Sequence, residues 1–357
     1  MFLAIRDIRF AKGRFALMGG VVALITLLLV MLSGLTAGLG NQSTSAIAAL
    51  PVQQIVFGAP AGADAKASYT ESEVSATQLQ AWRDVPGVSS VEPLGISQSR
   101  FQSLSGTGEA SGTTNAAVFG GTSANVQDGS AVVSESIAKE LGLQPGSRVR
   151  AGGKDLTVSE IAADQWYSHT AVVWTSLQDW RTIAHAAPGT ATVLGVNYDA
   201  GASLDLQAAN AAAGTVSTDR SGSFQALGSY KSENGSLMLM QAFLYGISAL
   251  VIMAFLTVWT VQRTRDIAVL RALGGSTGYV LRDALSQASI VLAAGAGLGG
   301  ALGLAGGLLA GQAAPFLITP LTTLLPVLGI FVLGLAGSAI AVRRVTTVDP
   351  LLALGGN

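Results

Sequence analysis

Residues 15–40 read FALMGGVVALITLLLVMLSGLTAGLG, a run that contains no charged residue. A helix of about 20 apolar residues crosses the roughly 30 Å hydrocarbon core of a bilayer. The run therefore predicts a membrane-spanning helix near the N-terminus. It is also longer than the roughly 7–15 residues of the apolar part of a signal peptide, so we expect it to stay in the protein as a span.

Three further apolar runs of spanning length follow in the C-terminal half of the chain. They lie at about 236–262, 285–312 and 318–342, and the second of them is rich in glycine. The whole chain of 357 residues is 50% hydrophobic and only 11% charged, whereas soluble domains are about 25% charged. The sequence thus predicts an α-helical membrane protein with four transmembrane helices.

Charge is distributed unequally between the segments that these runs separate. The N-terminal tail, the loop between the second and third spans and the C-terminal tail together hold ten basic and four acidic residues. Segment 41–235 holds ten basic and seventeen acidic residues, which completes the net charge of −1. Short basic segments remain in the cytoplasm. We therefore expect both termini on the cytoplasmic side of a bacterial plasma membrane and segment 41–235 on the outside.

This topology predicts nine successive parts of the chain. They are a cytoplasmic amphipathic N-terminal helix (1–14), a first span (15–40), an extracytoplasmic α+β domain ending in a stalk helix (41–235), a second span (236–262), a cytoplasmic coupling segment (263–284), a third span (285–312), a short outer loop (313–317), a fourth span (318–342) and a cytoplasmic tail (343–357).

The extracytoplasmic segment has the mixed pattern of a compact α+β module. Short β-branched runs such as QQIVF at 53–57 predict strands. Gly142 predicts the end of a helix, and Gly152–Gly153 predicts a turn between two paired strands. The small polar residues of 105–115 predict a flexible turn or hairpin loop, and from about Ser223 we expect one helix that continues into the second span.

The run TRDIAVLRALGGS at 264–276 follows the second span directly. It resembles, nearly residue for residue, a signature of the MacB/FtsX-like ABC transporter permeases, with Asp266 where Glu is commoner. VVSE at 132–135 and DPLLAL at 349–354 resemble further segments of the same family. The resemblance implies the architecture predicted above, with an extracytoplasmic domain of the MacB type.

The same resemblance implies that segment 263–284 docks on a separate ABC ATPase, and that two copies of this ATPase serve a homodimer of the permease. The residues that would couple to the ATPase are Arg263, Arg265, Asp266, Leu270, Arg271, Leu273 and Gly274. The alternative is a basic loop that only fixes the topology. The chain carries no G-x-x-x-x-G-K-[ST] phosphate loop, so we expect ATP to bind only to the partner subunit.

No constellation of residues predicts an enzyme. There is no cysteine, and the two histidines, His169 and His185, have no second ligand at metal-site spacing. The spans hold no charged residue, which argues against transport driven by an ion gradient. We expect no catalytic site, no metal site, no covalently bound cofactor and no nucleic-acid partner.

Within the family, the short chain and the N-terminal AIRDIRF at 4–10 are most similar to the haem-exporter permeases. This likeness implies haem as the transported amphiphile. Iron accepts His, Met, Tyr or carboxylate ligands, and eight side chains of these kinds lie near the predicted outer ends of the spans: Met31, Tyr69, Glu71, Glu73, Tyr230, Glu233, Met238 and Met240. Methionines at the end of an apolar helix are also ordinary packing residues.

Two other functions stay open at this point. One is an ABC exporter that moves a peptide, a lipid or a lipoprotein with the same machinery. The other is an FtsX-like mechanotransmitter that transports nothing and passes ATPase motion to an enzyme outside the cell.

Overall fold

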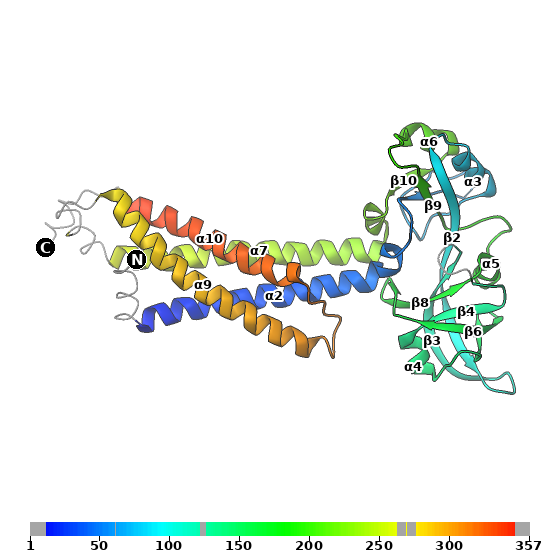
Figure 1. Cartoon of the computed structure of the whole chain (residues 1–357), viewed down its shortest axis with the longest axis horizontal. Coiled ribbons are helices and arrows are strands. Elements are labelled where there is room, and N and C mark those ends of the chain that lie inside the picture. The colour runs from blue at the N-terminus through cyan, green and yellow to red at the C-terminus, as the bar shows by residue number, and fades with distance from the viewer. Residues whose placement is uncertain (1–11, 61, 122–125, 263–268, 270–275, 347–357) are drawn as a thin grey trace. The chain divides into compact units, whose positions relative to one another are not determined.

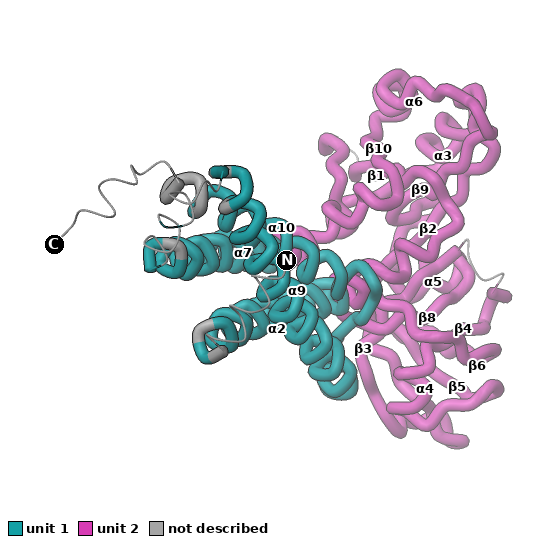
Figure 2. Tube along the Cα trace, turned by 60° about the vertical axis from the view of Figure 1, so that its left-hand side comes forward, with its two compact units in different colours: residues 1–39, 236–357 teal, residues 40–235 magenta. Residues whose placement is uncertain are grey.

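The computed structural model describes residues 12–60, 62–121, 126–262, 269 and 276–346 (Figure 1). The chain divides into two compact units, shown in two colours in Figure 2. Residues 1–39 and 236–357 form one, here called the membrane unit, and residues 40–235 form the other, here called the outer unit. The predicted division between an apolar helical part and a mixed α/β part is therefore seen in the fold.

Four long helices supply the candidate membrane spans of the described residues. Their bounds are α2 (Lys12–Ala48), α7 (Gly228–Gln262), α9 (Thr277–Ala310) and α10 (Pro320–Thr346). By length and hydropathy each can cross a bilayer, which confirms the four predicted membrane helices. Helices α2 and α7 are longer than a span requires, and the last residues of α2 and the first residues of α7 belong to the outer unit.

Glycines on α9 let this helix approach α2 closely. A Cβ atom built on Gly295 would lie 2.8 Å from the carbonyl oxygen of Gly19, and one built on Gly303 would lie 2.7 Å from a methyl of Val30. Real Cβ atoms do not come so near, so only glycine fits these positions. With Gly299 between them, these glycines follow one another at intervals of four residues, the small-residue spacing that serves helix contact in lipid.

The outer unit contains ten strands and four α-helices among its described residues. The strands are β1 (Gln54–Phe57), β2 (Val88–Leu104), β3 (Ala110–Gly120), β4 (Ser130–Ser134), β5 (Arg148–Ala151), β6 (Lys154–Ala162), β7 (Trp166–Tyr167), β8 (Thr170–Thr175), β9 (Val193–Tyr198) and β10 (Val216–Asp219). The helices are α3 (Ala76–Arg83), α4 (Glu135–Leu141), α5 (Leu177–Ala184) and α6 (Leu206–Ala213), and a 3-10 turn, η1 (Gly222–Ala226), precedes α7.

Strand β2 joins two lobes of the outer unit. Its first half pairs with β9, which continues to β1 and β10, and its second half pairs with β3. Because β2 also pairs with β5, the strands β2-β3-β8-β4-β6-β5 form a closed circuit. Because the circuit is closed, each of these six strands pairs with a neighbour on both sides. Helices α4 and α5 pack on the strands of this second lobe, and α3 packs against β2 and α6.

Local sequence signals explain several of these elements. Ser75 and Gln78 form a complete capping box at the start of α3. Gly142 ends α4 with φ 64°, and β5 pairs with β6 across the turn at Gly152–Gly153, so both predictions are confirmed. The hairpin loop predicted at 105–115 is present between β2 and β3 at 105–109. The prediction is wrong over 110–115, because β3 begins at Ala110 and pairs there with the end of β2.

The outer ends of α2 and α7 are anchored in one hydrophobic core. Ile47 and Leu50, at and after the end of α2, are buried with Phe57 and Phe119 of the sheet. Leu227, just before α7, belongs to the same cluster. The connection into each helix is therefore held by packing as well as by the covalent chain.

Candidate functional site

The tip of the β7–β8 hairpin lies on the part of α2 that belongs to the outer unit. The backbone N–H of Ser168 donates to the carbonyl of Ser43 (3.0 Å), and that of His169 donates to the carbonyl of Gln42 (3.0 Å). Both tip residues have positive φ, 49° for Ser168 and 63° for His169. This left-handed conformation costs an L-residue about 1–2 kcal/mol, so the tip is held in a strained geometry.

Side chains extend the same contact to α7. Nε2 of His169 lies 3.1 Å from Oγ of Ser43 and 2.9 Å from Oε2 of Glu233. Oγ of Ser168 lies 2.9 Å from Oγ of Ser229. The His169 and Glu233 side chains are 35% and 33% exposed, so water reaches the pair. We call these five residues, Ser43, Ser168, His169, Ser229 and Glu233, the clasp.

The clasp contains a serine, a histidine and a carboxylate, but it does not have the geometry of a hydrolase triad. In such a triad one ring nitrogen faces the serine and the other faces the acid. Here Ser43 and Glu233 both contact Nε2 of His169. The carboxylate therefore cannot orient the ring while Nε2 takes a proton from the serine. The arrangement joins two helices to a hairpin and does not activate a nucleophile.

Tyr230 and Glu233 lie three residues apart on α7 and therefore share a face of the helix. The Tyr230 ring packs edge-on against Phe224, with 6.1 Å between the ring centres. A Cβ atom built on Gly40 would lie 3.5 Å from the same Tyr230 ring, so this ring also faces α2. The Tyr230 and Glu233 side chains are both half-buried, and His169 lies beside Glu233.

The other three predicted contacts in the outer unit have different environments. Tyr69 is buried, its hydroxyl donates to Oγ of Ser223 (2.9 Å), and burial raises its pKa far above the usual value. Tyr69 is thus neutral, and it could bind iron only after this hydrogen bond opened. Glu71 lies 3.9 Å from the ammonium of Lys66, and Glu73 is exposed.

The three predicted methionines belong to the membrane unit. Met31 is half-buried on α2, and its sulfur would lie 3.4 Å from a Cβ atom built on Gly306 of α9. Met238 and Met240 are 61% and 48% exposed on α7. Their exposure leaves them accessible to lipid, to a second copy of the chain or to an apolar ligand.

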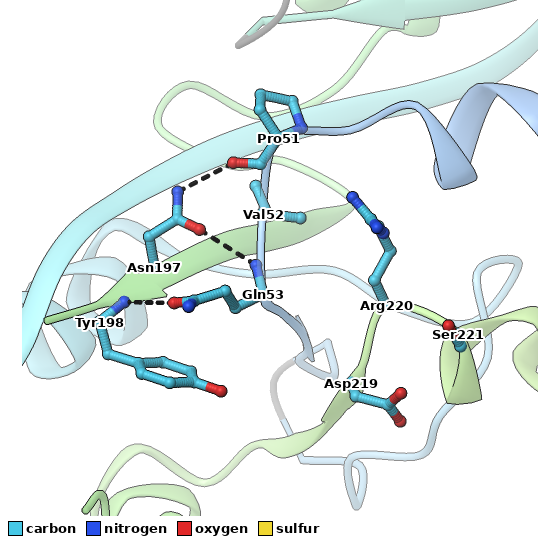
Figure 3. Close-up of a pocket in the computed structure, with 8 residues that line it drawn as sticks. All are labelled: Pro51, Val52, Gln53, Asn197, Tyr198, Asp219, Arg220 and Ser221. Carbon is cyan, nitrogen blue, oxygen red and sulfur yellow. Dashed lines mark hydrogen bonds between the residues drawn. The ribbon is translucent and has the colours of Figure 1, made fainter. Parts of the chain in front are cut away.

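A second feature of the outer unit is an open pocket of 670 Å³ between the two connections to the helices (Figure 3). It is lined by Pro51, Val52, Gln53, Asn197, Tyr198, Asp219, Arg220 and Ser221.

Polar bonds hold the walls of this pocket together. Nη1 of Arg220 donates to the carbonyl of Leu50 (2.7 Å). The Asn197 amide binds the backbone of Pro51 and of Gln53 at 3.0 Å each (Figure 3). The lining is mainly polar and carries one basic and one acidic side chain. Such a surface suits a polar ligand better than a lipid chain or a porphyrin ring.

Two family matches cover most of the chain. Residues 15–215 match the MacB-like periplasmic core domain, and residues 238–350 match the FtsX-like permease C-terminal domain. The first match alone spans more than half of the sequence. The chain belongs to the MacB/FtsX-like permease family. The resemblance read from the motifs is thereby confirmed.

Among curated relatives, a putative hemin transport system permease protein HrtB of Staphylococcus epidermidis is 24% identical over 365 residues, covering 100% of this chain and 99% of the relative. An uncharacterized ABC transporter permease of Mycobacterium bovis is 23% identical over 367 residues, with the same two coverages. Among solved structures, the extracellular domain of the noncanonic ABC-type transporter YknZ from Gram-positive bacteria is 15% identical, covers 46% of this chain and 98% of that one, and gives a TM-score of 0.34.

Membership in the family makes this permease the membrane subunit of an ABC transporter in the cell membrane, with an ATPase as partner subunit. The residues predicted to couple to that ATPase, from Arg263 to Gly274, lie outside the described residues. Helix α7 ends at Gln262 and α9 begins at Thr277, with Ser276 as its N-cap. The coupling assignment therefore stays a prediction from the sequence.

The sequence did not identify His169 as part of a site. It lies 126 residues from Ser43 and 64 residues from Glu233, and nothing local connects the three. One signal was present in the sequence. Tyr167-Ser168-His169-Thr170 joins two β-rich runs with a two-residue turn that lacks Gly or Asn, and such turns usually require these residues.

Proposed function

We propose that this permease is the membrane subunit of an ATP-driven haem exporter. It would work as a homodimer with two separate ATPase subunits, and it would take haem from the membrane and release it outside. Both termini and segment 263–284 would lie in the cytoplasm, as the charge distribution predicts.

The observation that carries the cargo assignment is the set of iron-ligand side chains at the outer end of α7. Tyr230 and Glu233 share one face of that helix, and His169 reaches Glu233 from the hairpin. Phenolate, carboxylate and imidazole are all ligands that haem iron accepts. The exposed Met240 lies seven residues after Glu233, so it shares that face of α7 and would extend the contact along the helix, whereas Met238 lies on a different face.

The comparison with curated proteins supports the same cargo. The S. epidermidis relative, a putative hemin transport permease, matches this chain along its entire length, so the similarity includes the outer unit and all four spans. A match limited to the C-terminal half would have supported only the ATPase-driven machinery.

The apolar composition of the spans fits the proposed route. Haem is a planar, largely apolar dianion that partitions into lipid, and no charged group in the spans offers a path for a hydrated ion. ATP binding would close the two ATPase subunits and move segment 263–284. Because this segment follows α7 directly, the motion would reach α7 first.

An absorbance titration with haem tests the cargo. Detergent-purified permease should give a saturable Soret shift, and Tyr230→Phe with Glu233→Gln should weaken binding by about tenfold or more, since both would remove a direct contact. The matched control is Tyr198→Phe with Glu160→Gln, which changes the same residue types elsewhere in the outer unit. A titration without saturation would refute haem as cargo.

The ATPase complex provides the second measurement. Haem should raise ATP turnover of the reconstituted complex, and Leu270→Ala should abolish that stimulation while the permease still inserts into the membrane. If peptides, lipids or lipoproteins stimulated turnover and haem did not, the exporter would have a different cargo. Turnover that responded to none of them would favour a mechanotransmitter.

A further inference from the structure

The start of α2 and the end of α7 enclose an apolar cleft of 210 Å³. These two helix ends lie at the same end of the membrane unit (Figure 1). The candidate spans begin at Phe15 on α2 and end at Trp259 on α7. Six of the seven residues that line the cleft are apolar, and the seventh is Gln262, the last residue of α7. The cleft therefore lies where the hydrocarbon of a bilayer meets its headgroups.

Helical spacing brings the lining side chains of each helix together. Phe255, Val258 and Trp259 lie three and four residues apart and share one face of α7. The Phe15 ring packs edge-on against Trp259, with 5.8 Å between the ring centres. Met18 belongs to the hydrophobic core of the membrane unit, whereas the Val258 side chain is 57% exposed. The cleft thus extends from the core of this unit to its surface.

The size and the lining of the cleft restrict what can occupy it. Water needs two to four polar partners to stay in a buried site, and this lining offers mainly hydrocarbon and aromatic carbon. Pockets that hold a drug-sized molecule measure about 300–1,000 Å³, so a porphyrin ring would not fit. A gap left empty would forfeit van der Waals contacts on both of its sides. A lipid acyl chain is narrow, apolar and available from the bilayer.

Positive charge lies next to the cleft. The first turn of α2, residues 12–15, holds Lys12 and Arg14 and no acidic residue. Phe15, the first lining residue, follows Arg14 directly. Basic residues beside a span attract anionic lipid headgroups, and each adds to the affinity. A lipid whose chain enters the cleft would therefore bind more tightly if its headgroup carried a negative charge.

We propose that this cleft is a binding site for one anionic phospholipid of the inner leaflet. The acyl chain fills the space between α2 and α7, and the headgroup lies beside the first turn of α2. The charge distribution of the chain, which predicts that this end of the spans is cytoplasmic, assigns the leaflet. The site requires neither a particular cargo nor a bound ATPase.

Quenching of tryptophan fluorescence by brominated lipids tests the site, because bromine on an acyl chain quenches a ring that it touches. Trp259 is the only tryptophan of the predicted spans, and the other four lie in the outer unit: Trp82, Trp166, Trp174 and Trp180. Subtracting the signal of Trp259→Phe from that of the unchanged full-length permease isolates this residue. The permease would be placed in phosphatidylcholine vesicles that contain rising fractions of dibrominated phosphatidylglycerol or, in a parallel series, of dibrominated phosphatidylcholine.

We expect half of the quenching at an about tenfold lower fraction of phosphatidylglycerol than of phosphatidylcholine. Val258→Phe should abolish this preference, because the added ring takes the place of the acyl chain. Val261→Phe is the matched control, since Val261 is also 57% exposed on α7 but is not one of the residues that line the cleft. This control should keep the preference.

A second pair of variants tests the charge. Lys12→Gln with Arg14→Gln should make the two lipids quench equally, while the chain still reaches Trp259. Arg343→Gln with Arg344→Gln removes two positive charges from α10, a helix that contributes no residue to the lining of the cleft. This matched pair should leave the preference for phosphatidylglycerol unchanged.

Three results would overturn the proposal. Equal quenching by both lipids in the unchanged protein would indicate ordinary lipid contact. An absence of quenching by either lipid would indicate that another occupant, such as a second copy of the chain, covers the cleft. A preference that survived both Val258→Phe and the loss of Lys12 and Arg14 would place the lipid elsewhere. Since the measurement uses neither haem nor ATP, its failure and a failed haem titration are distinguishable.

Discussion

Substitution of Gly299 on α9 tests whether close backbone contact holds the membrane unit together. A Cβ atom built on Gly299 would lie 2.8 Å from the Cβ of Thr26 and still nearer to the carbonyl oxygen of Ala23. Both atoms belong to the interior of α2, and Thr26 is fully buried with its hydroxyl bonded to the carbonyl of Val22. They cannot give way as the end of a flexible side chain can. In Gly299→Ala the two helices must therefore separate.

The expected magnitude comes from two opposing effects. Overpacking of a tight contact destabilises by about 1–3 kcal/mol, whereas replacing glycine by alanine in a helix gains up to about 1 kcal/mol. Gly297 lies on the same helix and has no atom within 4 Å of a Cβ built there. Gly297→Ala should therefore gain the helix propensity of alanine without any overpacking. The free energies of unfolding of the two variants should therefore differ by about 1–3 kcal/mol.

Unfolding by sodium dodecyl sulfate in mixed micelles, followed by circular dichroism, measures this difference. Because the two variants share the change in helix propensity, their comparison isolates the contact with α2. Equal stabilities of Gly299→Ala and Gly297→Ala would refute the assignment of Gly299 to a helix contact. A more stable Gly299→Ala would show that α9 does not press against α2 at this point.

Three further predictions concern the outer unit. Asp179→Ala should destabilise it by about 2–4 kcal/mol, because this buried carboxylate binds Lys154 at 3.1 Å and the backbone N–H of Gly129 at 2.6 Å. Thermal unfolding measures this loss of stability, and an unchanged midpoint temperature would contradict the prediction. Burial raises the pKa of Tyr69 and of Tyr167 above the unfolded value of about 10, so the stability that they contribute is complete below pH 10 and declines as the pH rises further. Absorbance at 295 nm should then show these two of the six tyrosines ionising only as the fold is lost, and full ionisation with native circular dichroism would refute their burial. Ser75→Ala should cost about 1 kcal/mol, read from the same thermal scans, because it removes the N-cap of α3.

The sequence predicted the elements whose signals are local. An uncharged run long enough to cross a bilayer is sufficient to predict a span, because no other structure satisfies the backbone in lipid. Gly142 and the Gly152–Gly153 pair predicted a helix end and a turn, since both positions require positive φ. The error at 110–115 arose because that stretch is rich in Ser, Gly and Thr. Its strand is stabilised by pairing with β2, a partner that composition does not reveal.

The residues of the candidate site also differ in whether the sequence alone could reveal them. Tyr230 and Glu233 could be proposed from the sequence because both are iron-ligand types that lie just before the predicted second span. His169 could not, because its partners lie 64 and 126 residues away and meet it only through the pairing of β7 with β8. Tyr69 looked like an available ligand in the sequence, yet the fold buries it and bonds its hydroxyl to Ser223.

By itself the sequence determined that four helices can cross a membrane and that an α+β domain stands between the first two, and it predicted where an ABC ATPase docks. These properties depend on hydropathy, charge and short motifs, each contained within a few tens of residues. Only the tertiary structure decided which polar side chains meet at the outer ends of α2 and α7. Contacts between distant segments are set by strand pairing and core packing, which join residues from all along the outer unit.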